Sequence, residues 1–188
     1  LIKNFDKEVD RMNRLISDIS NFSRTMSEIE TEKFKIIELN KFLDDFCINY
    51  IGNKKNISLK FKKSDEDLIV LLNEHKFLQV IMNLIDNSIS MSDNLTSILI
   101  KLEKKEFNNA EIKIYDQGKG INFEDKFKVF NRFYTDRDEF RDEHSGLGLS
   151  ISKEIIKSFN GSIELTKSDN LDFGGACFMI NLPLRVTL

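Results

Sequence analysis

Paired asparagines are the first residues of this 188-residue chain that could do chemistry. Asn83 and Asn87 lie four residues apart in a stretch with helical periodicity, so both side chains project from one helix face. Asparagine is an unfavourable residue in a helix interior. Amide oxygens can ligate Mg²⁺ and amide nitrogens can donate to phosphate, whereas an exposed polar stripe explains this pair alone equally well.

A carboxylate followed by glycines forms the second group. Asp116, Gly118 and Gly120 follow a predicted strand in the pattern D-x-G-x-G. Glycine permits positive φ and lets a ligand approach the backbone closely. An aspartate at the end of the strand can accept a hydrogen bond from an exocyclic amine such as that of adenine. Many ordinary turns share this pattern, so on its own it indicates only a turn.

Glycines also open a predicted helix and precede the last predicted strand. Gly146, Leu147 and Gly148 stand where a helix begins, and the free N–H groups of a helix N-terminus favour phosphate. An ordinary loop-to-helix junction is the alternative there. Gly175 belongs to a glycine pair before the final strand, where a plain turn is sufficient explanation.

An aromatic stretch lies between these glycine turns. Phe130, Phe133 and Tyr134 have helical spacing, with Arg132 among them and Arg137 in the charged run that follows. Such spacing usually indicates core, but a run this dense in charge cannot be buried cheaply. A short aromatic-anchored helix within a charged loop fits better, and long loops of this kind commonly act as lids.

The elements that must position these groups include both strands and helices from Glu32 onward. Period-two and helical patterns predict strands over 33–38, 56–61, 97–102, 110–115, 162–166 and 176–182, and helices over 39–51, 74–89 and 148–159. Several strands follow one another without an intervening helix. This order predicts a mixed sheet covered on one face by helices, an α/β sandwich.

The N-terminal residues carry a different pattern. Apolar residues recur at steps of three and four from Ile2 to Ile29, with no glycine or proline among them. This rhythm is typical of a coiled coil or helical bundle. A helix packed on its own domain is the alternative, but the strict spacing favours pairing with another helix.

Composition excludes several classes of protein. With 28 basic and 31 acidic residues the net charge is −3, which argues against a nucleic-acid partner and against a polybasic membrane-surface protein. Cys47 and Cys177 lie far apart without CxxC partners, so neither a disulfide scaffold nor a zinc site is expected. The longest apolar run, Leu68 to Leu72, is far too short to span a membrane. We therefore expect a cytoplasmic setting.

Taken in order, these motifs resemble the ATP-binding domain of bacterial sensor histidine kinases, in the group that includes gyrase and the heat-shock 90 chaperones. The resemblance covers Glu32 to Leu184. It implies the two-layer α/β sandwich of the histidine kinase, gyrase and Hsp90 ATPase type, preceded by a long coiled-coil helix. Residues 1–31 would then be part of the second helix of the dimerization and histidine phosphotransfer region, and residues 32–188 the ATP-binding catalytic domain.

The resemblance also implies roles for individual residues. Asn83 would bind Mg²⁺ through its side-chain oxygen and Asn87 would contact the phosphates of ATP. Asp116 would hold the adenine amine, with Gly118 and Gly120 shaping that end of the pocket. Phe133 would belong to the aromatic lid element. The remaining nucleotide contacts would come from the lid and the glycine turns, namely Phe130, Arg132, Tyr134, Arg137, Gly146, Leu147, Gly148 and Gly175.

Several positions depart from the pattern of these kinases. Ser90 stands where a basic residue is usual, Thr135 where arginine is frequent, and His144 where the motif has its first glycine. Arg137 is a possible substitute at the lid. The acceptor histidine belongs to a first dimerization helix, and neither His75 nor His144 matches it, so no catalytic residue of that kind is expected in this chain.

The resemblance implies a kinase fragment that binds Mg·ATP, transfers the γ-phosphoryl group to a histidine and feeds the receiver domain of a response regulator. Such a fragment would be unable to phosphorylate itself. The parent protein would dimerize through the N-terminal helix and be anchored in the bacterial inner membrane. ATP-hydrolysing relatives carry a glutamate four residues before the metal asparagine, and here that position is Gln79, which cannot take a proton. A nucleotide-binding scaffold without kinase activity is the alternative.

Overall fold

The computed structural model describes residues 33–51, 57–91, 96–121, 123–134 and 145–185, together with residues 9, 12–13, 16–17, 19–20, 22–25 and 27–28 near the N-terminus. All of the described residues from 9 to 28 are helical. Within the described part of the chain, no helix combines the length and the apolar character needed to cross a membrane.

A mixed sheet of five strands, ordered β2-β4-β5-β7-β6, forms one layer. Its strands are β2 (Ile57–Lys62), β4 (Thr96–Lys105), β5 (Asn109–Asp116), β6 (Ser162–Thr166) and β7 (Cys177–Pro183). The pair β2 and β4 is parallel, and the other neighbours are antiparallel. Each of these strands lies within a few residues of its predicted range.

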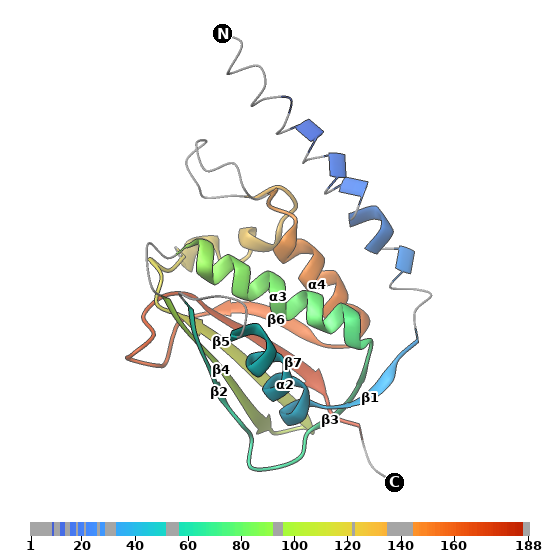
Figure 1. The fold of residues 1–188 in the computed structure, drawn as a ribbon, viewed down its shortest axis with the longest axis vertical. Coiled ribbons are helices and arrows are strands. Elements are labelled where there is room, and N and C mark those ends of the chain that lie inside the picture. The colour runs from blue at the N-terminus through green and yellow to red at the C-terminus, as the bar shows by residue number, and fades with distance from the viewer. Residues whose placement is uncertain are drawn as a thin grey trace.

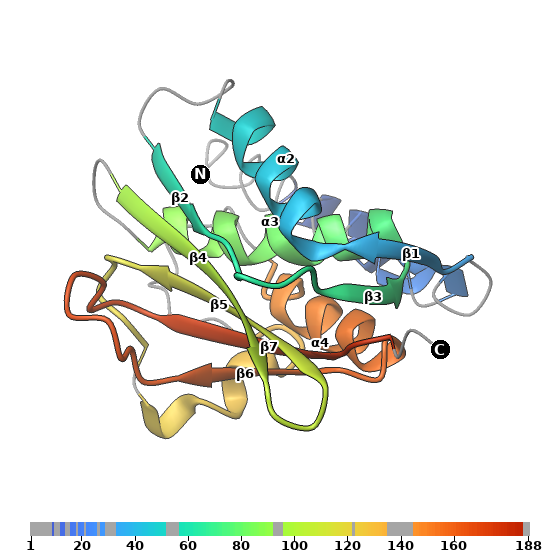
Figure 2. The same ribbon diagram turned by 90° about the horizontal axis from the view of Figure 1, so that it is seen from below.

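Three helices form the second layer over one face of this sheet (Figure 1 and Figure 2). They are α2 (Leu39–Ile51), α3 (Glu74–Ser90) and α4 (Gly148–Ser158). Alternate residues of the central strands, among them Ile100, Ile112 and Ile114, are fully buried beneath the helices. The predicted two-layer α/β sandwich is therefore confirmed.

A small second sheet lies at the edge of the domain (Figure 2). It pairs β1 (Lys35–Glu38) with β3 (Ile69–Leu72) in antiparallel register. β3 is not among the strands predicted from the sequence. In this strand Val70 and Leu72 are buried while Leu71 is half exposed. Burial therefore alternates along the strand, but hydrophobicity does not, because every residue of the run is apolar, so the sequence pattern does not reveal a strand.

The start of α3 is fixed by a side-chain cap, and this sets the position of its two asparagines. Asn73 accepts a hydrogen bond at Oδ1 from the backbone N–H of Lys76, at 2.9 Å. The side of the helix that includes Phe77 and Leu84 is buried against the sheet. Asn83 and Asn87 are half-buried beside that apolar side.

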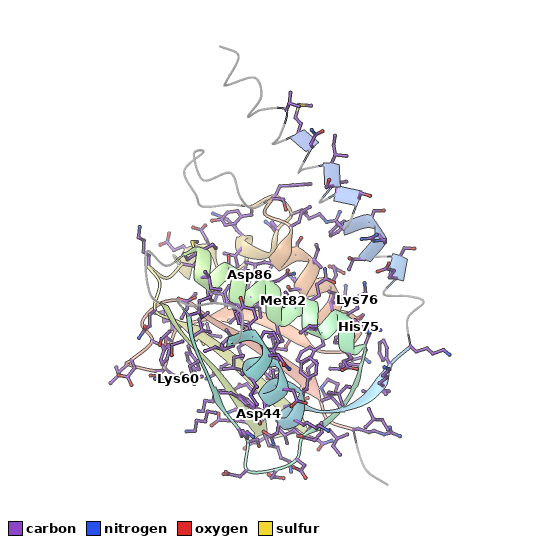
Figure 3. The ribbon with its side chains drawn as sticks, in the orientation of Figure 1. Asp44, Lys60, His75, Lys76, Met82 and Asp86 are labelled. Carbon is purple, nitrogen blue, oxygen red and sulfur yellow. The ribbon has the colours of Figure 1, made fainter. Side chains whose placement is uncertain are left out.

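Part of the N-terminal helix packs against the α/β domain. The Arg132 guanidinium lies 4.6 Å from the centre of the Phe22 ring, and Thr25 is buried. Glu28 accepts a hydrogen bond from the nearly buried Lys76 ammonium at 2.6 Å, and Figure 3 shows Lys76 on α3. This stretch of the apolar seam therefore contacts its own domain, which was the less favoured of the two interpretations.

The preceding part of the seam is exposed. Its described apolar residues are 39–62% exposed, and these are Val9, Met12, Ile16 and Ile19. Ile2, Phe5, Met26 and Ile29 lie outside the described residues. A coiled coil with a second helix would cover the exposed positions, and this pairing stays a prediction.

Candidate functional site

The carboxylate of Asp116 lies at the end of β5 and is 2% exposed. Its Oδ1 accepts hydrogen bonds from the backbone N–H groups of Gly118 at 2.9 Å and Ala176 at 2.8 Å. Burial raises the pKa of this carboxyl, while hydrogen bonds from these amides and from the Ser88 hydroxyl act in the opposite direction. A carboxylate has about four lone-pair sites, so these three hydrogen bonds leave it able to accept from one further donor, such as an exocyclic amine.

Gly175 packs directly against this carboxylate. Its N–H donates to the Asp116 carbonyl at 3.0 Å, and the Asp116 N–H donates in turn to the Ala176 carbonyl at 3.1 Å. A Cβ on Gly175 would overlap Asp116 Oδ1 and would lie 2.6 Å from the Gly118 nitrogen. The close approach of these two backbone segments therefore requires glycine at position 175.

Asn83 reaches from α3 to the beginning of α4. Its amide nitrogen donates to the Gly148 carbonyl at 3.1 Å and to the Ser152 hydroxyl at 3.3 Å. These two bonds occupy both amide hydrogens and leave the side-chain oxygen for a cation. Mg²⁺ prefers oxygen ligands, so this side chain fits the role of a magnesium ligand. No cluster of three or more His, Cys, Asp or Glu side chains with metal-binding geometry occurs among the described residues.

The N-terminus of α4 has the chemistry of an anion-binding site. Leu147 occupies the cap position and, within the described residues, contributes no side-chain cap. The first N–H groups of a helix lack partners within the helix and carry the positive end of its dipole. Because Asn83 touches Gly148 at this same point, a phosphate held by the helix end would lie beside the proposed magnesium ligand.

Gly146 joins the two described segments that flank residues 135–144. It has φ +72°, and its carbonyl accepts a hydrogen bond from the Phe133 N–H at 3.1 Å. A Cβ at this position would lie 2.8 Å from both the Phe133 carbonyl carbon and the Tyr134 carbonyl oxygen. The residues on either side of segment 135–144 are therefore held together by backbone contact, with glycine required at their meeting point.

The aromatic residues predicted to belong to a lid lie just before residues 135–144. Phe130 is 7% exposed and its ring lies 6.3 Å from that of Phe178, so it is part of the main core. Tyr134 is half-buried against the same core, whereas Phe133 is half exposed. The predicted short helix is a single 3₁₀ turn, Lys128–Phe130.

Comparison with known proteins adds the deciding observation. The sequence pattern of the family described as "Histidine kinase-, DNA gyrase B-, and HSP90-like ATPase" matches residues 72–186. The chain belongs to this ATPase family. The chain is 35% identical to the sensor protein ChvG of Rhizobium meliloti (strain 1021), over 94% of its own length and 33% of that protein.

Solved structures of sensor kinases share the fold of this ATPase family member. The catalytic domain of the histidine kinase ThkA has a TM-score of 0.67 at 26% identity, covering 81% of this chain and 98% of that one. A structure of ThkA in complex with the response regulator protein TrrA has a TM-score of 0.69 at 24% identity, covering 95% of this chain and 51% of that one. The chain spans about a third of the length of the curated relatives that it matches.

The resemblance to the ATP-binding catalytic domain of bacterial two-component sensor histidine kinases is therefore confirmed. Within this ATPase domain, direct contacts join Asp116 with Gly118 and Gly175, and Asn83 with Gly148. Gly120, with φ +74°, lies against Gly175.

Other predicted contacts lie apart from these groups. The Arg132 guanidinium contacts Phe22 of the N-terminal helix. Arg137 lies outside the described residues, as do Thr135 and His144. The nucleotide and magnesium contacts predicted for all of the site residues, those in the two groups included, stay predictions.

The structure adds three residues of the ATPase domain that the sequence analysis did not single out. Ser88 lies beside the Asp116 carboxylate, Ser152 accepts from Asn83, and the N–H of Ala176 fixes Asp116. Each lies within four residues along the chain of a predicted site residue. The two serines are buried polar residues in helices, and each lies close in sequence to a predicted site residue. A polar residue at a position that the helical pattern predicts to be buried is the signal that would have identified them.

Proposed function

We propose that the chain is the catalytic part of a sensor histidine kinase, which binds Mg·ATP and transfers its γ-phosphoryl group to a histidine of the parent protein. The observation that carries this proposal is the buried Asp116 carboxylate, which two backbone amides orient at the end of β5. It offers a charged acceptor to an adenine amine. The open N-terminus of α4 and the side-chain oxygen of Asn83 supply complementary groups for phosphate and magnesium.

In phosphoryl transfer the side chains of such a domain need not form covalent bonds to the substrate. Catalysis relies on positioning and on neutralising the charge of the phosphates. Magnesium held by Asn83 would supply part of that neutralisation. The α4 N-terminus would orient the phosphates, and Asp116 with Gly175 would fix the base at the other end. The acceptor histidine would be the nucleophile, so the domain needs no strong base of its own.

The residue at position 79 favours transfer to histidine over hydrolysis of ATP. Gln79 lies on α3 four residues before Asn83 and is half-buried. An amide cannot accept the proton of an attacking water, so a general base is missing at the place where the hydrolysing relatives have one.

The partners of the parent protein belong to the same proposal. We infer that it forms a homodimer through the N-terminal helix, because the seam from Val9 to Ile19 is exposed in the single chain. The structure of ThkA with TrrA supports a response regulator as the recipient of the phosphoryl group. The homology to sensor proteins supports a parent anchored in the bacterial inner membrane, with this part on its cytoplasmic side.

A nucleotide-binding scaffold without kinase activity is the second candidate, and Ser90 is the observation that favours it. Ser90 replaces the usual basic residue, and its hydroxyl donates to the Asn87 carbonyl at 2.9 Å. It therefore supports the end of α3 and supplies no positive charge for a phosphate.

We predict that Asn83→Ala removes the gain in ATP affinity that Mg²⁺ brings. The substitution deletes the oxygen proposed to bind the cation, while Asp116 still binds adenine, so weak ATP binding should persist. Calorimetric titration with ATP, with and without Mg²⁺, measures the difference. Met82→Ala is the matched control, because this neighbouring residue of α3 is 41% exposed (Figure 3). A full magnesium response in Asn83→Ala would place the ion elsewhere.

The kinase proposal itself is tested by phosphotransfer between two chains. Incubated alone with γ-labelled ATP, the chain should bind the nucleotide and stay unlabelled. When a fragment of the same parent protein that carries the acceptor helix is added, an acid-labile phosphohistidine should form on that fragment. Label on this chain alone would make His75 or His144 an acceptor and contradict the proposal. Tight binding of ATP with neither chain labelled would favour the scaffold.

A further inference from the structure

The loop between β6 and β7, residues 167–176, reaches both faces of the sheet at one end of β5. Successive side chains of a strand point to opposite faces. Ile114 lies in the main core beneath the helices, whereas Tyr115 belongs to a separate apolar cluster with Phe173 and Cys177. Asp116 points again to the helix side, where it meets Ser88 of α3. The loop therefore contacts Tyr115 on one face and Asp116 on the other.

Asp169 joins the loop to the face of the sheet away from the helices. Its Oδ1 accepts a hydrogen bond from the Tyr115 hydroxyl at 2.7 Å, and its Oδ2 accepts one from the Lys113 ammonium at 2.7 Å. Both donors come from β5 and stand two residues apart, so they lie side by side. Hydrogen bonds from Lys113 and then Tyr115 lower the pKa of the Asp169 carboxyl to about 2, so it is ionised at neutral pH.

The loop also has hydrogen bonds between its own residues. The Ser168 hydroxyl bonds to the Phe173 carbonyl at 2.5 Å, and the Phe173 N–H donates to the Asn170 carbonyl at 3.1 Å. Phe173 is 6% exposed, and its ring lies 6.3 Å from that of Tyr115. A displacement at Asp169 would therefore be transmitted along the loop toward Gly175.

The other end of the loop holds the adenine-binding carboxylate proposed above. The Gly175 N–H donates to the Asp116 carbonyl, and the Ala176 N–H donates to Asp116 Oδ1. The orientation of the carboxylate thus depends on where the loop places these two amides. Adenine has one exocyclic amine in a fixed direction, so a rotated carboxylate would lose that hydrogen bond.

We propose that Asp169 is a positioning residue for base recognition: by bridging Lys113 and Tyr115 it holds the loop so that the amides of Gly175 and Ala176 orient Asp116 toward the amine of adenine. This inference rests on the proposed function and deepens it, since it assigns base selectivity to a pair of contacts on the opposite face of the sheet.

The test compares three ligands that separate base recognition from phosphate binding. Dissociation constants are measured for ATP, for purine riboside 5′-triphosphate, which lacks the exocyclic amine, and for inorganic tripolyphosphate, each with Mg²⁺. The parent chain should prefer ATP over the purine riboside compound by about tenfold or more. Asp169→Ala should lower that preference by roughly threefold or more while tripolyphosphate binding stays the same. Asp169→Asn, which keeps an acceptor for Tyr115 and loses the charge, should have a smaller effect.

Asp172→Ala is the matched control, because it removes an exposed carboxylate from the same loop. It should keep the full preference for ATP. An unchanged preference in Asp169→Ala, or an equal loss of affinity for all three ligands, would overturn the positioning role and leave the proposed function standing. Failure of the parent chain to bind ATP would overturn the proposed function and this inference with it.

Discussion

Gly175→Ala is expected to reduce ATP affinity by at least about tenfold. The added Cβ would overlap Asp116 Oδ1 and would also lie 2.6 Å from the Gly118 nitrogen and 2.8 Å from the Asp116 carbonyl oxygen. Two of these three atoms are backbone, so they cannot move aside as the end of a flexible side chain would. Overpacking of this kind costs about 1–3 kcal/mol and displaces the carboxylate on which adenine binding depends.

The neighbouring glycine provides an unusually close control. A Cβ on Gly174 would meet no atom within 4 Å. Gly174→Ala adds the same methyl group one residue away and should leave both ATP affinity and thermal stability unchanged. Titration calorimetry measures the affinity, and thermal unfolding shows whether either variant loses its fold. If Gly175→Ala bound ATP as tightly as Gly174→Ala, the carboxylate would not be the base-recognition group.

The difference between Gly174 and Gly175 could not be predicted from the sequence. The sequence pattern predicts a turn at Gly174 and Gly175 but does not distinguish the two residues. Local sequence cannot show which of them contacts another segment. The requirement at position 175 comes from a residue of β5 some distance away along the chain. Contacts of this kind depend on tertiary structure and leave no trace in spacing or composition.

Elements with strong periodicity were predicted closely. The strand β6 (Ser162–Thr166) has its predicted bounds, and α3 (Glu74–Ser90) extends one residue beyond its predicted end. These segments alternate or repeat clearly because one side faces the core. The strand β3 (Ile69–Leu72) escaped prediction, since only one of its residues, Leu71, is substantially exposed and the run reads as uniformly apolar.

For the candidate site, as for the fold, some residues were predicted from the sequence and others were not. Asn83, Asp116 and several glycines were predicted as nucleotide-binding residues from their type, their spacing and the family resemblance. The structure brings Asp116 into contact with Gly118 and Gly175, and Asn83 into contact with Gly148, whereas their binding roles stay predictions. The sequence did not single out the residues that contact these groups from elsewhere. Ser88 reaches Asp116 from α3, and Asp169 lies in the loop between β6 and β7 and bonds to β5. A serine in a helix or an aspartate in a loop has too many ordinary explanations to be singled out from sequence.

Asp116→Asn is expected to lower ATP affinity by about ten- to a hundredfold while GTP affinity holds or rises. The substitution keeps an oxygen that can accept from the amides of Gly118 and Ala176, so the two buried N–H groups stay paired. The amide nitrogen then takes the place of Oδ2. It presents hydrogens to the adenine amine, which is also a donor, whereas it can donate to the carbonyl oxygen that guanine has at the same position.

Asp116→Ala separates this effect from a general loss of structure. It removes the acceptor for both backbone amides, and each buried unpaired N–H costs about 1–3 kcal/mol, so the alanine variant should be less stable than the asparagine variant. Both should lose the preference for ATP over GTP, but only the asparagine variant should do so with nearly unchanged thermal stability. Competition between ATP and GTP for a fluorescent nucleotide measures the preference directly. Equal selectivity for ATP in the parent chain and in both variants would mean that the base is recognised by other groups, and that the buried carboxylate serves only to join β5 to the loop at Gly175.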